Sequence, residues 1–180
     1  MDRDELVAEC VEAIAEHDPR LAVRTVLERA LAERELADAL GGLSGGLNVL
    51  HNAADLTILN VLWPPLVSLF PHDHRMWAAI AIYGGREDNT FYRREGSTLS
   101  KSGAKQLEAG DVLLLGDDVI HAVDNPNRTY TGAIHVYGGD FFTTPRSQWD
   151  AETLEEAPYD LAAVASEFER AEREFKTYPE

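Results

Sequence analysis

Cysteine and positive charge are both scarce in this sequence of 180 residues. Cys10 is its single cysteine, so the chain has no internal disulfide, which is usual for a protein of a reducing, cytoplasmic compartment. Only 16 lysine and arginine residues accompany 32 acidic ones, giving a net charge of -16, and the basic residues are scattered. Nucleic-acid and anionic membrane surfaces require clustered basic residues, so we expect neither as a partner.

Long apolar runs are absent as well. No run is long enough to cross a bilayer, and residues 1–5 lack the apolar core of a secretory signal. Hydrophobic residues make up 44% of the chain and charged residues 27%, the proportions of an ordinary soluble globular protein. A chain of this length is expected to form one structural domain with a core of normal size.

Two helices are predicted near the N-terminus. Apolar residues recur at every third or fourth position over residues 4–40, and the pattern breaks at Asp18-Pro19, where one helix should end and another begin. The glycine-rich segment 41–46 is expected to end the second helix.

Another helix is predicted near the C-terminus, after a polar segment at residues 143–147. Asp160 is its expected N-cap, and five apolar residues share one face: Leu161, Val164, Phe168, Ala171 and Phe175. This stripe either docks on the rest of the molecule or forms a homodimer interface, and the sequence fits both alternatives.

The middle of the chain, residues 47–137, has a different pattern. Short apolar or alternating runs are separated by turn residues such as Gly84-Gly85, with no helical stretch between them. Many short strands predict an all-β sandwich or barrel, and a jelly-roll closure would hide their edges. The expected organisation is a helical arm packed on the barrel (1–44), the barrel (45–142) and a C-terminal extension with a helix (143–180).

Histidines are concentrated on the predicted strands. His72 and His74 are separated by one residue at the start of what reads as a buried strand, so side-chain alternation places both imidazoles on one face. His121 closes a predicted hairpin that begins at Gly110-Asp111 and delivers a third imidazole to the interior. A single such histidine is more often an ordinary core residue, but converging imidazoles can share a divalent metal ion.

The histidine motifs resemble the two halves of the signature of the cupins, which are small double-stranded β-helix (jelly-roll) barrels. The first half is His72-Asp73-His74 followed by Gly85, and the second runs from Gly110-Asp111 to His121 and then Asn125. Within the cupins, the stretch from Asp55 to Arg94 and the motif Ala133-Ile134-His135-Val136-Tyr137 resemble the cysteine dioxygenase-like thiol dioxygenases. The resemblance covers roughly residues 45–142.

This resemblance implies a mainly β cupin barrel that is an enzyme, a non-haem iron(II) dioxygenase. His72, His74 and His121 would be the metal ligands, and the enzyme would add O2 to the sulfur of a small thiol to give a sulfinate. Tyr137 would hydrogen-bond the bound oxygen or the substrate and His135 would orient it, unless both are core residues. Another assignment makes His135 the third ligand, with His121 hydrogen-bonded behind it.

The sequence also departs from the family pattern. Ala78 stands where many cupins have a glutamate ligand, Ala79 where mammalian-type cysteine dioxygenases have a cross-linked cysteine, and Ala133 where their motif has a serine. The family's carboxylate-binding arginine has no clear equivalent, since the strand that approaches the site reads Leu-His-Asn-Ala over residues 50–53. These departures favour another small thiol, such as a mercapto-acid, over cysteine.

Arg75 and Trp77 are the candidate substrate-binding residues. Strand alternation places both opposite His74, out of the barrel, unless the strand bulges. For most arginines, surface ion pairs with acids such as Glu87 and Asp88 are the expected fate.

Two other functions fit the same ligands. A cupin with zinc, nickel or another divalent metal on three histidines could be a hydrolase or isomerase, because imidazole suits all these metals. A non-catalytic metal-binding cupin is the remaining alternative.

Overall fold

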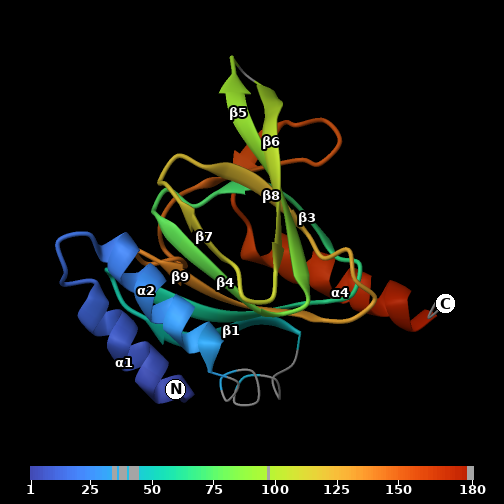
Figure 1. The fold of residues 1–180 in the computed structure, drawn as a ribbon. Coiled ribbons are helices and arrows are strands. Elements are labelled where there is room, and N and C mark those ends of the chain that lie inside the picture. Colours follow the sequence, from blue (N-terminus) through green and yellow to red (C-terminus); the bar gives the residue numbers. More distant parts are fainter. Residues whose placement is uncertain (34–35, 37–39, 41–44, 97, 178–180) are drawn as a thin grey trace.

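The structure is a computed structural model that describes residues 1–33, 36, 40, 45–96 and 98–177 (Figure 1). Its helices are α1 (Arg3–Ala13), α2 (Pro19–Ala32) and α4 (Leu161–Thr177). Its strands are β1 (Gly46–Asn52), β2 (Thr57–Trp63), β3 (Ser68–Asp73), β4 (Ala78–Gly84), β5 (Arg86–Glu95), β6 (Thr98–Glu108), β7 (Val112–Leu115), β8 (Ile120–Asp124), β9 (Thr131–Tyr137), β10 (Ser147–Trp149) and β11 (Glu156–Pro158).

The strands form two antiparallel sheets. One has the order β1-β2-β9-β4-β7 and the other the order β11-β10-β3-β8-β5-β6. Without β1, β10 and β11, the orders β2-β9-β4-β7 and β3-β8-β5-β6 are those of a jelly roll, in which the chain passes repeatedly from one sheet to the other. The predicted fold class, a mainly β double-stranded β-helix of the cupin type, is confirmed.

Strands β2 and β9 are buried at every position, because their sheet is covered on both faces. Leu59 and Val61 of β2 point into the core between the two sheets. Ile58 of the same strand points the other way and packs with α1 and α2. Successive side chains of one strand thus pack into two separate apolar clusters, one on each face of the sheet.

Helices α1 and α2 cover the outer face of the five-stranded sheet (Figure 1). The predicted break between them is confirmed: Asp18 caps α2 by accepting a hydrogen bond from the Leu21 N–H at 3.2 Å, with Pro19 at the first helical position. Helix α2 ends at Ala32, and the predicted end at residues 41–46 falls largely outside the described residues. No helix in the described part of the chain is long and apolar enough to span a membrane.

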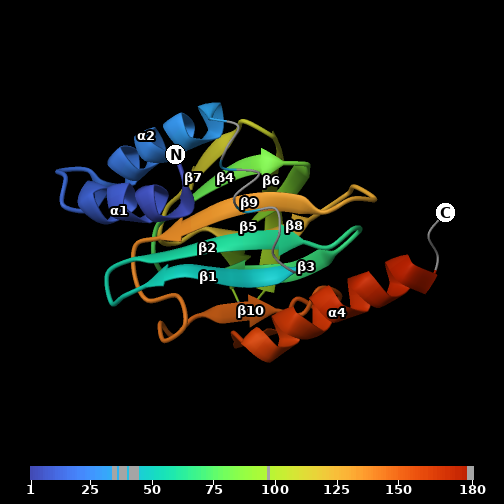
Figure 2. The same ribbon diagram turned by 90° about the horizontal axis from the view of Figure 1, so that it is seen from below.

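Helix α4 docks on the barrel, beside β1 and β10 in Figure 2. Val164, Phe168 and Ala171 join the core between the sheets, so barrel docking is the correct alternative for these three residues of the stripe. The predicted N-cap is also confirmed, because Asp160 Oδ1 accepts the Ala162 N–H at 2.8 Å.

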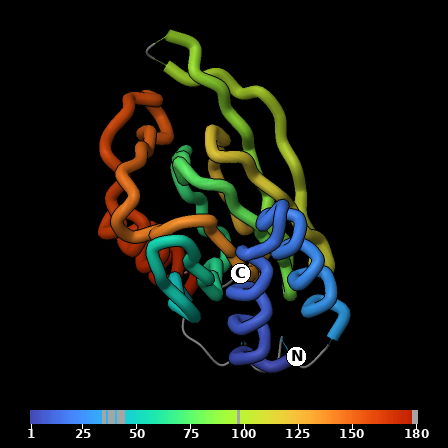
Figure 3. The backbone as a smooth tube through the Cα atoms, turned by 90° about the vertical axis from the view of Figure 1, so that its left-hand side faces the viewer, coloured from blue at the N-terminus to red at the C-terminus, as the bar shows by residue number. Residues whose placement is uncertain are grey.

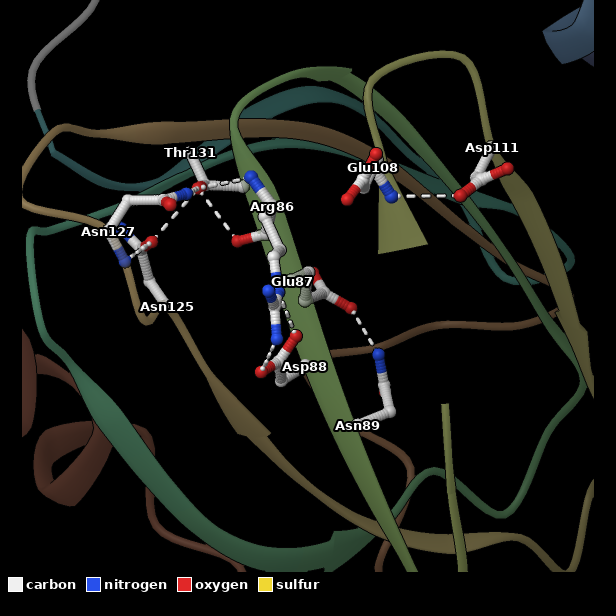
Figure 4. Close-up of polar contacts among 9 residues, drawn as sticks. All are labelled: Arg86, Glu87, Asp88, Asn89, Glu108, Asp111, Asn125, Asn127 and Thr131. Atoms are coloured by element: carbon white, nitrogen blue, oxygen red, sulfur yellow. Dashed lines mark hydrogen bonds and ion pairs between the residues drawn. The ribbon is translucent and has the colours of Figure 1, made fainter. Parts of the chain in front are cut away.

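One turn residue from each cupin-like motif, Gly85 and Asn125, lies against Thr131, and Figure 4 shows the Asn125 contact. Gly85 has φ +78°, and a Cβ added there would lie 2.4 Å from Thr131 Oγ1, so no larger residue fits. Asn125 Oδ1 accepts the Thr131 hydroxyl at 3.0 Å. Gly110 has φ +101°, and the following Asp111 accepts the Glu108 N–H at 2.8 Å.

One strand prediction is wrong, and one strand has no signal in the sequence. β3 ends at Asp73 and the chain turns at Arg75, whose φ is +56°, so the histidine pair closes β3 instead of opening β4. β6 was not predicted, because most of its residues are exposed and polar and it has no apolar alternation. Its pairing with β5 gives a long hairpin that extends beyond the barrel (Figure 3).

Candidate metal centre

The three histidines of the two motifs meet inside the barrel. His72 and His121 are direct partners in the antiparallel pairing of β3 with β8, and their ring centroids are 4.7 Å apart. His74 follows two residues after His72, with its ring 4.9 Å from that of His121. All three are buried, and one nitrogen from each lies within 4.8 Å of the other two.

Hydrogen bonds behind the rings orient two of them. His72 Nδ1 lies 3.1 Å from the Phe70 carbonyl oxygen, and His121 Nδ1 lies 2.7 Å from Asn89 Oδ1. A ring nitrogen facing an acceptor oxygen carries the proton, so each Nε2 keeps its lone pair. His121 Nε2 faces His74 Nε2 at 3.3 Å.

The cluster favours neutral imidazoles. Burial lowers the pKa of His72 to about 4 and lowers the pKa values of His74 and His121 well below the ordinary histidine value. The neighbouring imidazoles act in the same direction on each of them, since protonated rings would repel. Neutral imidazole is the form that binds a metal.

A divalent ion fits this donor set. Two nitrogens that each lie about 2.1 Å from one ion are roughly 3 to 4 Å apart, and the facing nitrogens of His74 and His121 are 3.3 Å apart. The metal-compatible group found among the described residues consists of His72, His74 and His121, and contains no carboxylate. Imidazole ligands alone suit iron, zinc, copper and nickel, so the metal is not identified.

A cavity of about 20 Å³ adjoins the cluster, space for roughly one water molecule. Most of its lining is apolar. Its lining residues with polar groups include His72, His74, His121, His135, Tyr137 and Tyr159. The structure therefore brings five of the seven residues predicted for the site to one small, closed space.

His135 and Tyr137 form a hydrogen-bonded pair on β9. His135 Nδ1 lies 3.0 Å from the Tyr137 hydroxyl, and the Tyr137 ring is 4.9 Å from the ring of His74. Burial raises the pKa of Tyr137 well above its ordinary value, so Tyr137 is a neutral phenol at neutral pH. His135 therefore lies behind Tyr137, because Nδ1 faces the Tyr137 hydroxyl and Nε2 lies 3.4 Å from Glu87. This geometry favours His121 over His135 as the third donor of the cluster.

Arg75 and Trp77 lie outside the cavity. Arg75 is partly exposed, and its Nε pairs with Asp73 Oδ2 at 2.6 Å. Trp77 packs beside the cluster formed by α1, α2 and the outer sheet face. Neither residue lies in a strand, because the chain turns at Arg75 between the end of β3 and the start of β4, and this turn carries both side chains away from the cavity.

Glu87 corrects the expectation of a surface acid, because its side chain is fully buried. Figure 4 shows Glu87 and Asn89 on one side of β5, with the ion pair between Arg86 and Asp88 on the other. Glu87 Oε1 accepts from Asn89 Nδ2 at 2.9 Å, and Oε2 accepts from Trp63 Nε1 at 2.7 Å. The strand alternation of β5 could have separated Glu87 from Asp88, had the inward face of that strand been known.

Arg146 is the second charged residue that the sequence did not reveal, because it lies in a polar segment that reads as a solvated loop. Its side chain is buried, and the guanidinium carbon lies 4.0 Å from the ring centre of Phe141 and 3.9 Å from that of Tyr159. One amino group donates to the Phe141 carbonyl oxygen. Nε and Nη2 have no hydrogen-bond partner in the described part of the chain.

The fold and the cluster define the class of protein: a cupin-type double-stranded β-helix with a buried three-histidine site that could hold a metal ion. A scan against protein-family models finds no match. The strand order of this chain establishes its fold.

Solved structures of similar architecture come from several organisms. An uncharacterised double-stranded β-helix protein of Klebsiella pneumoniae has 12% identity and a TM-score of 0.44, over 66% of this chain and 88% of its own. An RmlC-like cupin of Methanocaldococcus jannaschii has 14% identity and a TM-score of 0.45, over 54% of this chain and 82% of its own. An oxalate decarboxylase of Lactobacillus farciminis has 15% identity and a TM-score of 0.45, over 56% of this chain and 30% of its own.

Proposed function

We propose that the protein is a non-haem iron(II) thiol dioxygenase, which converts a small thiol and O2 into a sulfinate (R–SH + O2 → R–SO2H). The observation that carries the proposal is the buried cluster of His72, His74 and His121, in which three neutral imidazoles occur without a carboxylate. An iron(II) ion held by these residues would supply a redox centre with open positions where a thiolate and O2 can meet. A thiolate would also offset the charge that a carboxylate ligand would otherwise balance.

The His135–Tyr137 pair supports the same proposal. Tyr137 lines the cavity beside His74, and its protonated phenol is held by His135 Nδ1 at 3.0 Å. A hydroxyl in this position can hydrogen-bond a ligand at the cluster and hold it in a single orientation. The mainly apolar cavity has space for about one water molecule, so it excludes bulk water, and a thiol could enter only if the lining side chains moved apart.

Arg146 supports a thiol that carries a carboxylate. Its Nε–H and Nη2–H groups are buried and have no hydrogen-bond partner among the described residues, and such donors are costly to leave without an acceptor. Phe141 and Tyr159, whose rings flank the guanidinium, line the cavity, and Arg146 lies behind these two rings without lining the cavity itself. A guanidinium binds a carboxylate through paired N–H groups, which suits a mercapto-acid.

Metal analysis combined with oxygen uptake tests the proposal. Protein purified without added metal should contain iron near stoichiometry and consume O2 when a thiol from a panel is added, and the product should gain the mass of two oxygen atoms. Zinc without thiol-dependent oxygen uptake would contradict the proposal and favour the zinc hydrolase or isomerase alternative, to which the same three imidazoles are suited.

Two variants assign the residues. His121→Ala should lose both metal retention and turnover, because two imidazoles hold a divalent ion poorly. Tyr137→Phe should retain the metal and lower kcat, and His17→Gln, at an exposed histidine far along the chain from the motifs, should change neither. Normal metal content in His121→Ala would show that the ligand assignment is wrong.

A further inference from the structure

Glu87 is a buried acid that lies between both halves of the site, hydrogen-bonded to Asn89 on one side and close to His135 on the other. Its side chain has no exposed surface. One arm runs through Asn89, which donates to Glu87 Oε1 at 2.9 Å and faces His121 Nδ1 with its own oxygen at 2.7 Å. The other arm runs to His135, whose Nε2 lies 3.4 Å from Glu87 Oε2.

The donors around Glu87 establish that it is an acceptor. Trp63 Nε1, which carries a proton and can only donate, lies 2.7 Å from Oε2. The Asn89 amide group donates to Oε1. Each carboxyl oxygen of Glu87 therefore accepts one N–H group.

His135 Nε2 has no hydrogen bond within the described residues, and Glu87 Oε2 lies in ion-pair range of it. An unprotonated Nε2 would direct its lone pair at the carboxylate, and the two would repel. A proton on Nε2 is attracted instead, and a small ring rotation would complete the hydrogen bond. The other nitrogen, Nδ1, then has a lone pair for the Tyr137 hydroxyl at 3.0 Å.

We propose that Glu87 is a positioning residue that holds the His135 proton on Nε2, so that the Tyr137 hydroxyl donates to Nδ1 and turns its oxygen lone pairs toward the cavity. Tyr137 then accepts a hydrogen bond from the ligand. It does not donate its hydroxyl proton to bound oxygen, because that proton is directed at His135. A substrate that presents an N–H group beside the cluster is the chemistry that this acceptor recognises.

The proton position can be measured without turnover, by the ring ¹⁵N chemical shifts of histidine-labelled protein with zinc(II) in place of any paramagnetic ion. His135→Gln assigns the signals. The wild type should show a protonated Nε2 and an unprotonated Nδ1 for His135. A proton on Nδ1 in the wild type would overturn the proposal, and this measurement needs no variant of Glu87 that folds.

Variants then test whether Glu87 is the cause. Glu87→Gln conserves volume and should shift a measurable fraction of the His135 proton to Nδ1, whereas Asp88→Asn, which removes the neighbouring carboxylate on the other side of β5, should not. Trp63→Phe removes a donor to Glu87 and should preserve the wild-type tautomer. An unchanged tautomer in folded Glu87→Gln would also overturn the proposal.

The catalytic consequence rests on the proposed function and is tested separately. Glu87→Gln in metal-saturated enzyme should lower kcat by about 10- to 100-fold, the usual effect of losing a partner behind an active-site group, with a smaller change in KM. In a Tyr137→Phe background the further loss should be less than about threefold, because the group that Glu87 orients is gone. A full additional loss there would show that Glu87 acts elsewhere. If the wild type consumes no O2 with any thiol, the proposed function fails while the tautomer result stands.

Discussion

At the scale of single residues, burial decides what each charged side chain can do. Arg75 has a partner, Asp73, and is partly exposed, as most surface arginines are. Arg146 is buried between two aromatic rings, and two of its N–H groups have no partner in the part of the chain that the structure describes. The cost of burying unpartnered donors is justified in a site where a ligand supplies the acceptor, so Arg146 and not Arg75 is the better candidate for a substrate carboxylate.

Arg146→Lys is therefore expected to discriminate between thiols. Loss of charge-assisted hydrogen bonds costs about 1.5–3 kcal/mol, which is roughly a 10- to 100-fold increase in KM for a carboxylate-bearing thiol. KM for an uncharged thiol of similar size should change little, and metal content should be unchanged. Steady-state oxygen uptake measures both, with Arg75→Lys as the control. An equal loss for both thiols would exclude carboxylate binding by Arg146.

At the scale of secondary-structure elements, α4 completes the barrel. Phe168 contacts Trp63 edge-on with ring centroids 5.2 Å apart, and Trp63 in turn donates to Glu87. Val164 lines the cavity itself. The helix therefore closes one side of the core and supports the residue that holds Glu87 in place.

Phe168→Ala should destabilise the protein strongly. Truncation of a buried phenylalanine costs about 3–5 kcal/mol, because the apolar contacts are lost and a cavity is left. Denaturant unfolding should show this decrease, whereas Phe175→Ala, on the same stripe but partly exposed and outside the core cluster, should cost less than about half as much. Equal losses for the two variants would mean that α4 is not held by its Phe168 contact.

At the scale of the whole molecule, the barrel buries three imidazoles, and burial opposes their protonation. The pKa of His72 is about 4 in the folded protein, against an ordinary value of 6.5. Between these pH values the unfolded chain binds a proton that the folded chain does not. The contribution of His72 to the free energy of unfolding is therefore fully present above about pH 6.5. It is lost as the pH falls toward 4.

Acid should accordingly destabilise the metal-free protein. The His72 shift alone corresponds to roughly 3 kcal/mol of lost unfolding free energy between neutral pH and pH 4, and His74 and His121 add in the same direction. Urea unfolding at a series of pH values measures this loss, and a comparison with His72→Gln separates the contribution of His72 from that of the carboxylates. His17→Gln should follow the wild-type curve. The same pH dependence in His72→Gln would contradict the assignment.

The sequence by itself determined the fold class, the break at Asp18-Pro19, the cap at Asp160 and the spacing of the three histidines. These features depend on local physics: strand and helix periods, capping side chains, and turn positions such as Gly85 that exclude a Cβ. A strand with no apolar alternation, β6, has no such local signal and could not be found.

Only the tertiary structure decided which charged groups are inside. Glu87 and Asp88 are neighbours of the same chemical type, and the fold buries one of them and leaves the other paired with Arg86 near the surface. Likewise, the register that sets His72 opposite His121 depends on contacts between strands far apart in the chain. Burial and register are properties of long-range packing, and a residue's type and its near neighbours do not specify them.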